Sequence, residues 1–356
     1  MEKDLSLEEK IGQMFMFGVN KNNIDGILDL IKNNKIGGVI LYKQNYTSYE
    51  EMLSLIKRIR EANASNKTPL LVAVDQEGGR VNRMPPEFKN LRSITYVSDL
   101  NKPSLIKKYS EIISKELSES NINMNFAPVL DINNNSNNNV IKLRCFSNEE
   151  QKVSEYGKIY IKEMQSNNVI PVVKHFPGHG CTKKDSHMFL PYINNYKEML
   201  NKHMKPFEVA IKNNCDAIMV GHIIIPKLTG VFPASISQKF ISEYLRKRYN
   251  YDGLVITDDI RMKSVSILYR GVALKKAFTS ESDIVLFKYR KGDEKIIKKV
   301  VDMAKKGIIP EEKINKSVSR ILKIKEKYKV TDKIINKGCN IEEINKEIEK
   351  LNSNIK

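Results

Sequence analysis

The sequence has no tryptophan, only 4 cysteines and no long apolar run. No segment reaches the roughly 18 uninterrupted apolar residues that a membrane span needs. The cysteines lie far apart and form no CxxC pair, which favours reduced thiols over a disulfide framework. The first residues, MEKDLSLEEK, carry acids and lysines where a signal peptide would carry a basic end and an apolar run. We therefore expect a soluble, cytoplasmic protein with no membrane partner.

Acidic residues are outnumbered, 42 against 60 lysines and arginines, which gives a net charge of +18. Such an excess can mark a nucleic-acid partner. Here the lysines are scattered along the predicted helices, and no motif of aromatic and basic residues accompanies them. We therefore expect no nucleic-acid partner, and we expect a monomer.

Apolar runs of strand length alternate with segments that have apolar residues at three- and four-residue spacing, the period of a helix. Near-continuous apolar strands that alternate with helices predict a parallel sheet covered by helices. Eight such units predict a closed (β/α)8 TIM barrel over residues 1–330, and an open doubly wound sheet is the alternative. Residues 331–356 are expected to add a C-terminal helical tail with a frayed end. The predicted strands are 11–19, 36–43, 70–76, 123–131, 169–176, 215–222, 253–259 and 282–288.

Polar residues fall at the carboxyl ends of these strands, where the active face of such a barrel lies. A random scatter would place some of them within the apolar runs, where they would be costly. This asymmetry favours an enzyme. The residues concerned are Asp75, Asp131, Lys174, His175, His222, Asp258 and Asp259.

Some of these residues have a structural alternative. Asp131 could hydrogen-bond its own turn. Asp259 could cap a helix that begins near Ile260, which would leave Asp258 to face the barrel mouth. His222 could be a buried structural histidine or a contact near the site. These alternatives remain open from the sequence.

The strings KHFPGHG (174–180), DSH (185–187) and VITDDIRM (255–262) resemble those of the β-N-acetylglucosaminidases of glycoside hydrolase family 3. Supporting strings are DQEGGRVNR (75–83), NFAPVLDINNN (125–135), LRCF (143–146) and PASIS (233–237). The similarity runs in order from Leu5 to Lys329 and spans the whole predicted barrel. It implies the single-barrel form of the family, without the additional C-terminal domain that many relatives carry.

The resemblance also implies residue roles. Asp258 matches the catalytic nucleophile, and His187, oriented by Asp185, matches the general acid/base. No metal and no other cofactor is implied. The residues that match those holding the hydroxyls of a terminal N-acetylglucosamine are Asp75, Arg83, Arg144, Lys174 and His175.

The chemistry agrees with these roles. Retaining glycoside hydrolysis needs a carboxylate that attacks the anomeric carbon and a group that gives and later takes a proton. Histidine, with an ordinary pKa near 6.5, can do both near neutral pH. The implied activity is removal of terminal N-acetylglucosamine from a small carbohydrate, either a muropeptide or a disaccharide with an N-acetylmuramic acid unit, during recycling of peptidoglycan.

Three rival functions remain. A zinc-dependent hydrolase on the same barrel could use His175, His179, His187 or Cys181 as ligands. A catalytically dead barrel could bind wall sugars or nucleic acid through its charge. A phosphorylase could keep the same residues, because a histidine acid/base carries no negative charge that would repel phosphate.

Overall fold

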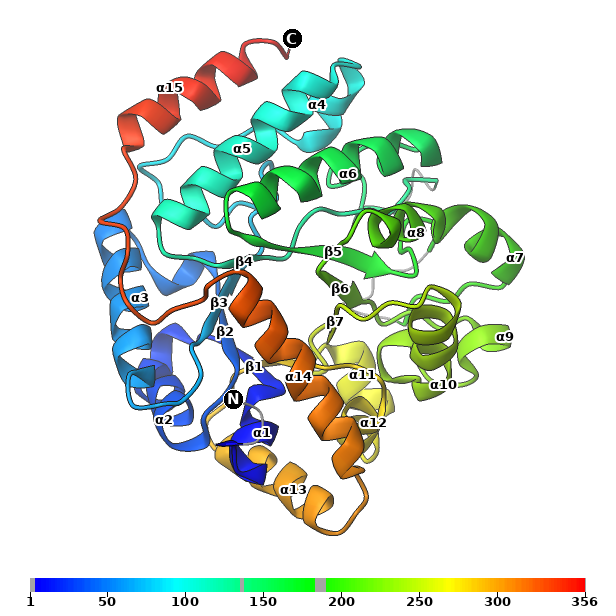
Figure 1. Cartoon of the computed structure of the whole chain (residues 1–356). Coiled ribbons are helices and arrows are strands. Elements are labelled where there is room, and N and C mark those ends of the chain that lie inside the picture. Colours follow the sequence, from blue (N-terminus) through cyan, green and yellow to red (C-terminus); the bar gives the residue numbers. More distant parts are fainter. Residues whose placement is uncertain (1–3, 135–137, 183–189, 356) are drawn as a thin grey trace.

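The computed structural model describes residues 4–134, 138–182 and 190–355. Its strands form one parallel sheet in the order β7-β6-β5-β4-β3-β2-β1-β8. The two end strands also meet, because the N–H of Thr257 donates to the carbonyl of Ile284 at 3.0 Å and the N–H of Asp283 donates to that of Val255 at 2.7 Å. The sheet thus closes into a barrel, with helices around it (Figure 1). The predicted barrel is confirmed.

Every predicted apolar run contains a strand. The strands are β1 Phe15–Gly18, β2 Gly38–Leu41, β3 Leu71–Val74, β4 Met124–Asn125, β5 Ile170–Phe176, β6 Ala217–Val220, β7 Leu254–Thr257 and β8 Val285–Lys288. Apart from the exposed Lys288 at the end of β8, their residues are buried on both faces of the sheet, which is why they read as continuous apolar runs.

The prediction of a strand over 11–19 was wrong in its first part. Residues Leu7–Gln13 form the helix α1, and the strand begins only at Phe15. The side chain of Ser6 accepts from the N–H of Glu9, whose own side chain accepts from the N–H of Ser6. This capping box starts a helix whose apolar residues then run directly into the strand.

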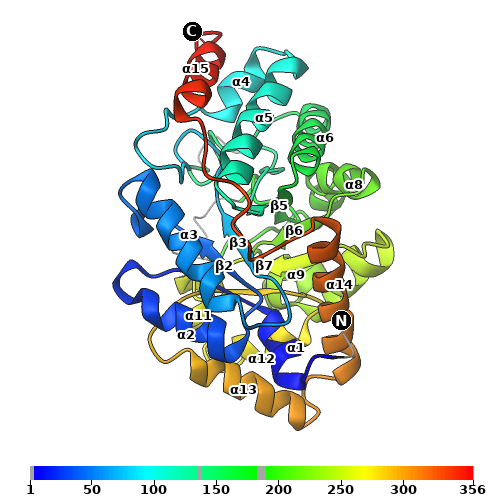
Figure 2. The same ribbon diagram turned by 60° about the vertical axis from the view of Figure 1, so that its left-hand side comes forward.

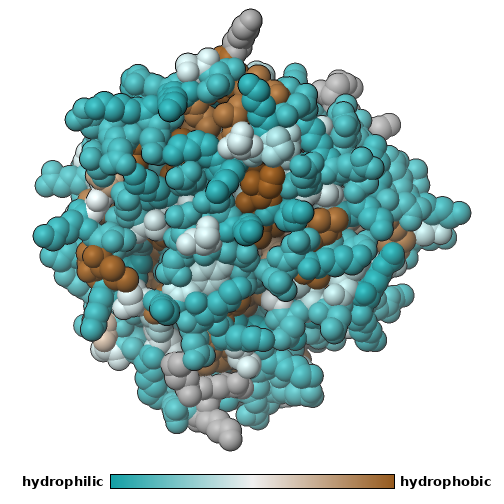
Figure 3. Space-filling model, turned by 45° about the horizontal axis from the view of Figure 1, so that its top comes forward, coloured by the Kyte–Doolittle hydropathy of each residue, from teal (hydrophilic) through white to brown (hydrophobic). Residues whose placement is uncertain are grey.

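The helices follow the predicted alternation. Their bounds are α1 Leu7–Gln13, α2 Ile24–Asn34, α3 Tyr49–Asn63, α4 Ile94–Asp99, α5 Pro103–Glu119, α6 Glu150–Ser166, α7 Tyr196–Glu198, α8 Lys205–Lys212, α9 Pro226–Thr229, α10 Gln238–Phe240, α11 Lys263–Leu268, α12 Ala273–Thr279, α13 Glu294–Lys305, α14 Glu311–Lys327 and α15 Ile341–Asn352. None of the helices in the described part of the chain combines the length and apolar character needed to cross a bilayer. The face in Figure 3 is largely hydrophilic, with its apolar residues in small separate patches.

Successive side chains of a strand point alternately toward the surrounding helices and toward the inside of the barrel. On β8, Phe287 stacks against Phe15 and Phe17 of β1, and Phe15 also meets Phe278 of helix α12, so these rings fill the layer between barrel and helices. Leu286 lines the cavity at the barrel mouth instead. This is the alternation of a pleated strand, and it separates the core from the site.

The C-terminal residues pack on the barrel as far as the structure describes them. Helix α15 buries Ile344, Ile348 and Leu351 and lies beside α5 in both ribbon views (Figures 1 and 2). Ile355 is buried and its carbonyl accepts from Arg92 at 2.7 Å. The predicted frayed end was therefore wrong up to this residue, because apolar and polar contacts hold it.

Candidate active site

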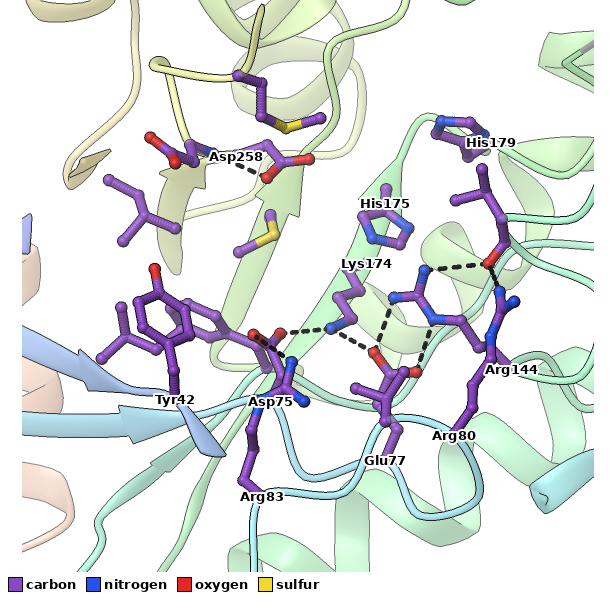
Figure 4. Close-up of a pocket in the computed structure, with 18 of the residues that line it drawn as sticks. Tyr42, Asp75, Glu77, Arg80, Arg83, Arg144, Lys174, His175, His179 and Asp258 are labelled. Carbon is purple, nitrogen blue, oxygen red and sulfur yellow. Dashed lines mark hydrogen bonds and ion pairs between the residues drawn. The ribbon is translucent and has the colours of Figure 1, made fainter. Parts of the chain in front are cut away.

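A cavity of about 490 Å³ opens at the carboxyl ends of the strands. Asp75 follows β3 directly, Lys174 and His175 lie at the end of β5, and Asp258 follows β7. Ile40, Met219 and Leu286 also line the cavity. The structure thus brings several sequence-predicted site residues into one cavity, and they are Asp75, Arg83, Arg144, Lys174, His175 and Asp258 (Figure 4).

Lys174 is the buried cation at the centre of the cavity wall. Its side chain is 2% exposed, and its Nζ lies 2.7 Å from Oδ1 of Asp75 and 2.6 Å from Oε1 of Glu77. Oδ2 of Asp75 lies 3.8 Å from Nη2 of Arg83. Asp75 therefore stands between two cations, and this holds its carboxylate in place at the cavity surface.

Glu77 joins Lys174 to Arg144. Nε of Arg144 donates to Oε2 of Glu77 at 2.8 Å, and its Nη2 donates to Oε1 at 2.8 Å, so the pair is bidentate. Burial raises the pKa of Glu77, but Arg144 and Lys174 outweigh it and hold that pKa well below its ordinary range. Sequence reasoning missed Glu77 as a site residue. The signal was present, because Glu77 stands two residues after Asp75 in DQEGGRVNR.

Asp131 orients His175. Its Oδ2 lies 2.7 Å from Nδ1 of His175, and its Oδ1 accepts from the backbone N–H of His179 at 2.5 Å. Burial raises the pKa of Asp131, while the charges of His175 and His179 and the bonds they donate lower it, and the net shift is downward. The carboxylate therefore accepts a hydrogen bond from the N–H at Nδ1, which leaves Nε2 of His175 for a ligand. The alternative that Asp131 merely bonds its own turn was wrong.

His179 also lines the cavity and is buried. Its Nδ1 lies 2.8 Å from the hydroxyl of Thr182. Burial and the charge of His175 lower the pKa of His179 to about 4. The ring is therefore neutral at physiological pH, and it supports the loop that follows β5.

The adjacent carboxyls Asp258 and Asp259 have different surroundings. Burial raises the pKa of Asp258, but the charges of His222 and His175, the bond from the N–H of Asp259 and the charge of Lys174 bring it below its ordinary value. Burial, together with the charge of Asp258, raises the pKa of Asp259. Two neighbouring carboxyls whose pKa values are pushed apart can have separate roles, and Asp258 is the more readily ionised of the two.

Asp259 holds the turn after β7. Its Oδ1 accepts from the N–H of Arg261 at 2.9 Å and from that of Lys288 at 3.1 Å. Helix α11 begins only at Lys263. The alternative of a cap on a helix that begins near Ile260 was therefore wrong, and Asp259 instead ties this turn to the end of β8.

His222 is buried and supports the same turn. Its Nε2 lies 2.9 Å from the carbonyl of Asp259, and its Nδ1 lies 2.6 Å from the hydroxyl of Ser235. A carbonyl only accepts, so Nε2 carries a proton and donates to it, while Nδ1 shares a hydrogen bond with the serine hydroxyl. His222 is thus a structural histidine whose charge also acts on Asp258. Its partner Ser235 is the first serine of the string PASIS.

Asp185 and His187 fall within 183–189, outside the residues that the structure describes, so their roles stay predictions. Within the described residues, no group of three or more His, Cys, Asp or Glu side chains is arranged to hold a metal ion. All four cysteines are free thiols.

Glu116 is a buried carboxyl on α5, and we expect it to make the stability of the fold depend on pH. It accepts from the side chain of Gln76 at 3.1 Å, and burial raises its pKa from 4.5 to about 8. Because the folded-state pKa lies above the unfolded one, stability falls as the pH rises from about 4.5 through about 8. Glu116→Gln should remove this loss, measured as the free energy of unfolding in urea at pH 5 and pH 8.5.

Glu119→Gln on the same helix is the matched control and should keep the pH dependence of the wild type. An unchanged pH dependence in Glu116→Gln would show that Glu116 is not the titrating group.

Comparison with known proteins places this site in a family. The model of the glycosyl hydrolase family 3 N-terminal domain matches residues 6–324. Beta-hexosaminidase A of Pseudoalteromonas piscicida is 32% identical over 326 residues, which are 84% of this chain and 54% of that protein. A beta-hexosaminidase of Psychromonas ingrahamii is 34% identical over 265 residues, 72% of this chain and 77% of that protein.

A solved structure agrees. The glycoside hydrolase family 3 β-N-acetylglucosaminidase from Paenibacillus sp. str. FPU-7 superposes with a TM-score of 0.91 at 30% identity, covering 99% of this chain and 69% of that one. The fold and the polar cavity thus define a glycoside hydrolase. The chain belongs to glycoside hydrolase family 3, and the predicted resemblance is confirmed. It spans about half the length of the first of these relatives and about three quarters of the second.

Proposed function

We propose that this protein is a retaining exo-β-N-acetylglucosaminidase that forms a covalent glycosyl-enzyme intermediate on Asp258. The observation that carries the proposal is the carboxylate of Asp258, whose pKa is lowered and which has no ion-pair partner among the residues that the structure describes, in a cavity whose other wall presents Asp75, Lys174 and His175. A sugar ring needs such a set of fixed donors and acceptors for its hydroxyls. The names of the related β-hexosaminidases support the N-acetylhexosaminide as the substrate class.

The proposed mechanism combines this arrangement with the residue roles that the family resemblance implies. The sugar binds with its hydroxyls on Asp75, Arg83, Arg144, Lys174 and His175. Asp258 attacks the anomeric carbon while His187, oriented by Asp185, protonates the leaving oxygen. His187 then takes a proton from water, which attacks the same carbon and releases the sugar with its configuration retained.

We further propose a peptidoglycan fragment as the natural substrate, in the cytoplasm. The cavity rim carries Arg80 and Arg83, and the chain has a net charge of +18. An anionic aglycone with a lactyl or peptide carboxylate would be attracted to such a rim. Comparing turnover of a muropeptide with turnover of a neutral chitobioside at low and high salt tests this point, because salt screens only the charged substrate.

The activity is tested with a chromogenic β-N-acetylglucosaminide, with and without phosphate, and with identification of the released sugar. We expect N-acetylglucosamine in both conditions. Release of the sugar 1-phosphate, with turnover dependent on phosphate, would assign a phosphorylase instead. Turnover of a β-glucoside but not of the N-acetyl sugar would overturn the proposed substrate class. Turnover that is lost in chelator would favour the zinc rival.

His187→Ala should lower kcat about a hundredfold, because general acid/base catalysis contributes about 10²–10⁴-fold. The loss should grow as the leaving group becomes more basic, since a good leaving group needs no proton. Kinetics on a series of substituted phenyl glycosides measures this. Azide, which needs no general base, should restore the second step and give a glycosyl azide.

Ser186→Ala is the neighbouring control and should leave the leaving-group dependence unchanged. Equal losses for good and poor leaving groups in His187→Ala would contradict the acid/base role.

A further inference from the structure

Helix α15 lies outside the barrel, yet it contacts the loop between β3 and α4, whose earlier residues line the cavity. Its apolar face is buried, and ion pairs attach it to α5. Nζ of Lys115 lies 2.7 Å from Oε1 of Glu343, and Nζ of Lys108 lies 3.2 Å from Oε1 of Glu347. Figures 1 and 2 both show α15 beside α5 and α4. Its other polar side chains reach residues 87–92, which lie between β3 and α4.

Asn345 holds the first part of this segment. Its Oδ1 accepts from the backbone N–H of Lys89 at 2.7 Å, and its Nδ2 donates to the carbonyl of Glu87 at 2.8 Å. The Lys89 side chain also pairs with Glu349. One side-chain amide thus satisfies a donor and an acceptor of a backbone that belongs to no strand or helix.

Asn352 repeats the arrangement on the next residues. Its Oδ1 accepts from the backbone N–H of Arg92 at 3.0 Å, and its Nδ2 donates to the carbonyl of Asn90 at 3.0 Å. Nη1 of Arg92 then donates back to the carbonyl of Ile355 at 2.7 Å. Residues 87–92 are therefore fixed to the helix at both ends.

The fixed segment in turn holds the turn that follows Asp75. Nδ2 of Asn90 donates to the carbonyl of Gly79 at 2.6 Å, and the N–H of Gly79 donates to the carbonyl of Leu91 at 2.8 Å. Gly79 has φ +57°, and a Cβ there would come within 3.0 Å of the backbone of Ser93. The turn can keep this close approach only while residues 90–93 stay where they are.

Tyr109 of α5 adds a second link. Its hydroxyl lies 2.8 Å from the carbonyl of Glu77 and 3.0 Å from that of Arg92. The same Glu77 carries the buried contacts to Lys174 and Arg144. A displacement of the segment that α15 holds would therefore move Glu77 and the two cations that it orients.

We propose that α15 is a positioning element for the substrate site, which acts through residues 87–92 on the turn that carries Glu77, Arg80 and Arg83. The inference rests on the proposed function for its kinetic readout. We call the contacts of Asn345 and Asn352 with residues 87–92 the clamp. Because Asp258 follows a different strand, β7, loosening the clamp should weaken the binding of the sugar more than it slows the chemical step.

The test is the double variant Asn345→Ala/Asn352→Ala of the full chain. With a chromogenic β-N-acetylglucosaminide we expect KM to rise about tenfold, below the roughly 10²-fold cost that a full 1 Å misplacement can have, while kcat changes less than twofold. The matched control is Asn354→Ala, because Nδ2 of Asn354 donates only to carbonyls of its own helix end, those of Lys350 and Leu351. It should behave as the wild type.

Hydrogen exchange separates the clamp from the substrate assignment, since it needs no turnover. We expect faster exchange over 76–92 in the double variant and unchanged exchange in α5 and α6. In an Arg83→Ala background the double variant should raise KM less than in the wild type, because one of the binding groups through which these contacts act is already gone. Unchanged exchange over 76–92, or the same rise in KM in both backgrounds, would overturn the proposal. Altered exchange in a protein without N-acetylglucosaminidase activity would reject only the proposed function.

Discussion

Asp258→Asn should lower kcat by about 10⁴-fold, the largest effect expected for this protein, because it removes the attacking carboxylate. The amide is nearly isosteric, and its oxygen can still accept from the N–H of Asp259, as Oδ1 of Asp258 does at 2.8 Å. Folding should therefore be preserved. Steady-state kinetics measures the loss, and a 5-fluoro N-acetylglucosaminyl fluoride, which keeps the 2-acetamido group, should label Asp258 in the wild type only.

Asp259→Asn is the control. Oδ1 of Asp259 accepts both of its hydrogen bonds from backbone N–H groups, and an asparagine oxygen can accept the same two. The kcat of this variant should therefore fall less than about tenfold, which corresponds to the free energy of one altered neutral hydrogen bond. Loss of activity in Asp259→Asn with turnover retained in Asp258→Asn would move the nucleophile by one residue.

Glu77→Ala should destabilise the fold by about 3–5 kcal/mol, the cost of breaking a buried ion pair from one side. Lys174 and Arg144 have side chains that are 2% and 13% exposed, so neither can turn to water when their common partner is removed. The free energy of unfolding in urea at pH 7 measures the effect. A smaller loss is expected for Glu77→Gln, which keeps two of the hydrogen bonds.

This contribution should depend on pH. The folded-state pKa of Glu77 lies below its unfolded value of 4.5, so the ion pair stabilises the fold above that pH, and its contribution is lost as the pH falls below it. The difference between wild type and Glu77→Ala should therefore shrink below about pH 4. Glu342→Ala breaks an exposed pair with Lys346 and should cost less than about 1 kcal/mol. Equal losses in the two variants would show that burial does not set the strength of the Glu77 contacts.

Much of the barrel could be predicted because its strands are buried on both faces. Each predicted run contains a strand, and the error at 11–19 arose because the last residues of α1, Ile11, Gly12 and Gln13, are buried and lie just before β1. Period cannot separate a short buried helix from a buried strand. The capping pattern Ser6 to Glu9 was the available signal.

The site was partly predictable because all the strands of a parallel barrel end on the same side, so residues that are far apart in the sequence meet at the mouth of the barrel. Asp75, Lys174 and Asp258 each end a strand and meet in the cavity. Glu77 was missed, and the role of Asp131 stayed open, because a carboxylate in a turn has many possible partners. Only the placement of β3, β4 and β5 side by side shows which cation or imidazole each one meets.

The sequence by itself determined the barrel and the face that carries the chemistry. It also determined which carboxylates and cations lie at the strand ends, since apolar runs and their period can be read from neighbouring residues. Only the tertiary structure decided the pairings. Glu77 meets Arg144, Asp131 meets His175, and Asn352 meets Arg92 across 260 residues. Such pairings depend on how the sheet closes and where α15 packs, and these are set by the packing of all the elements together.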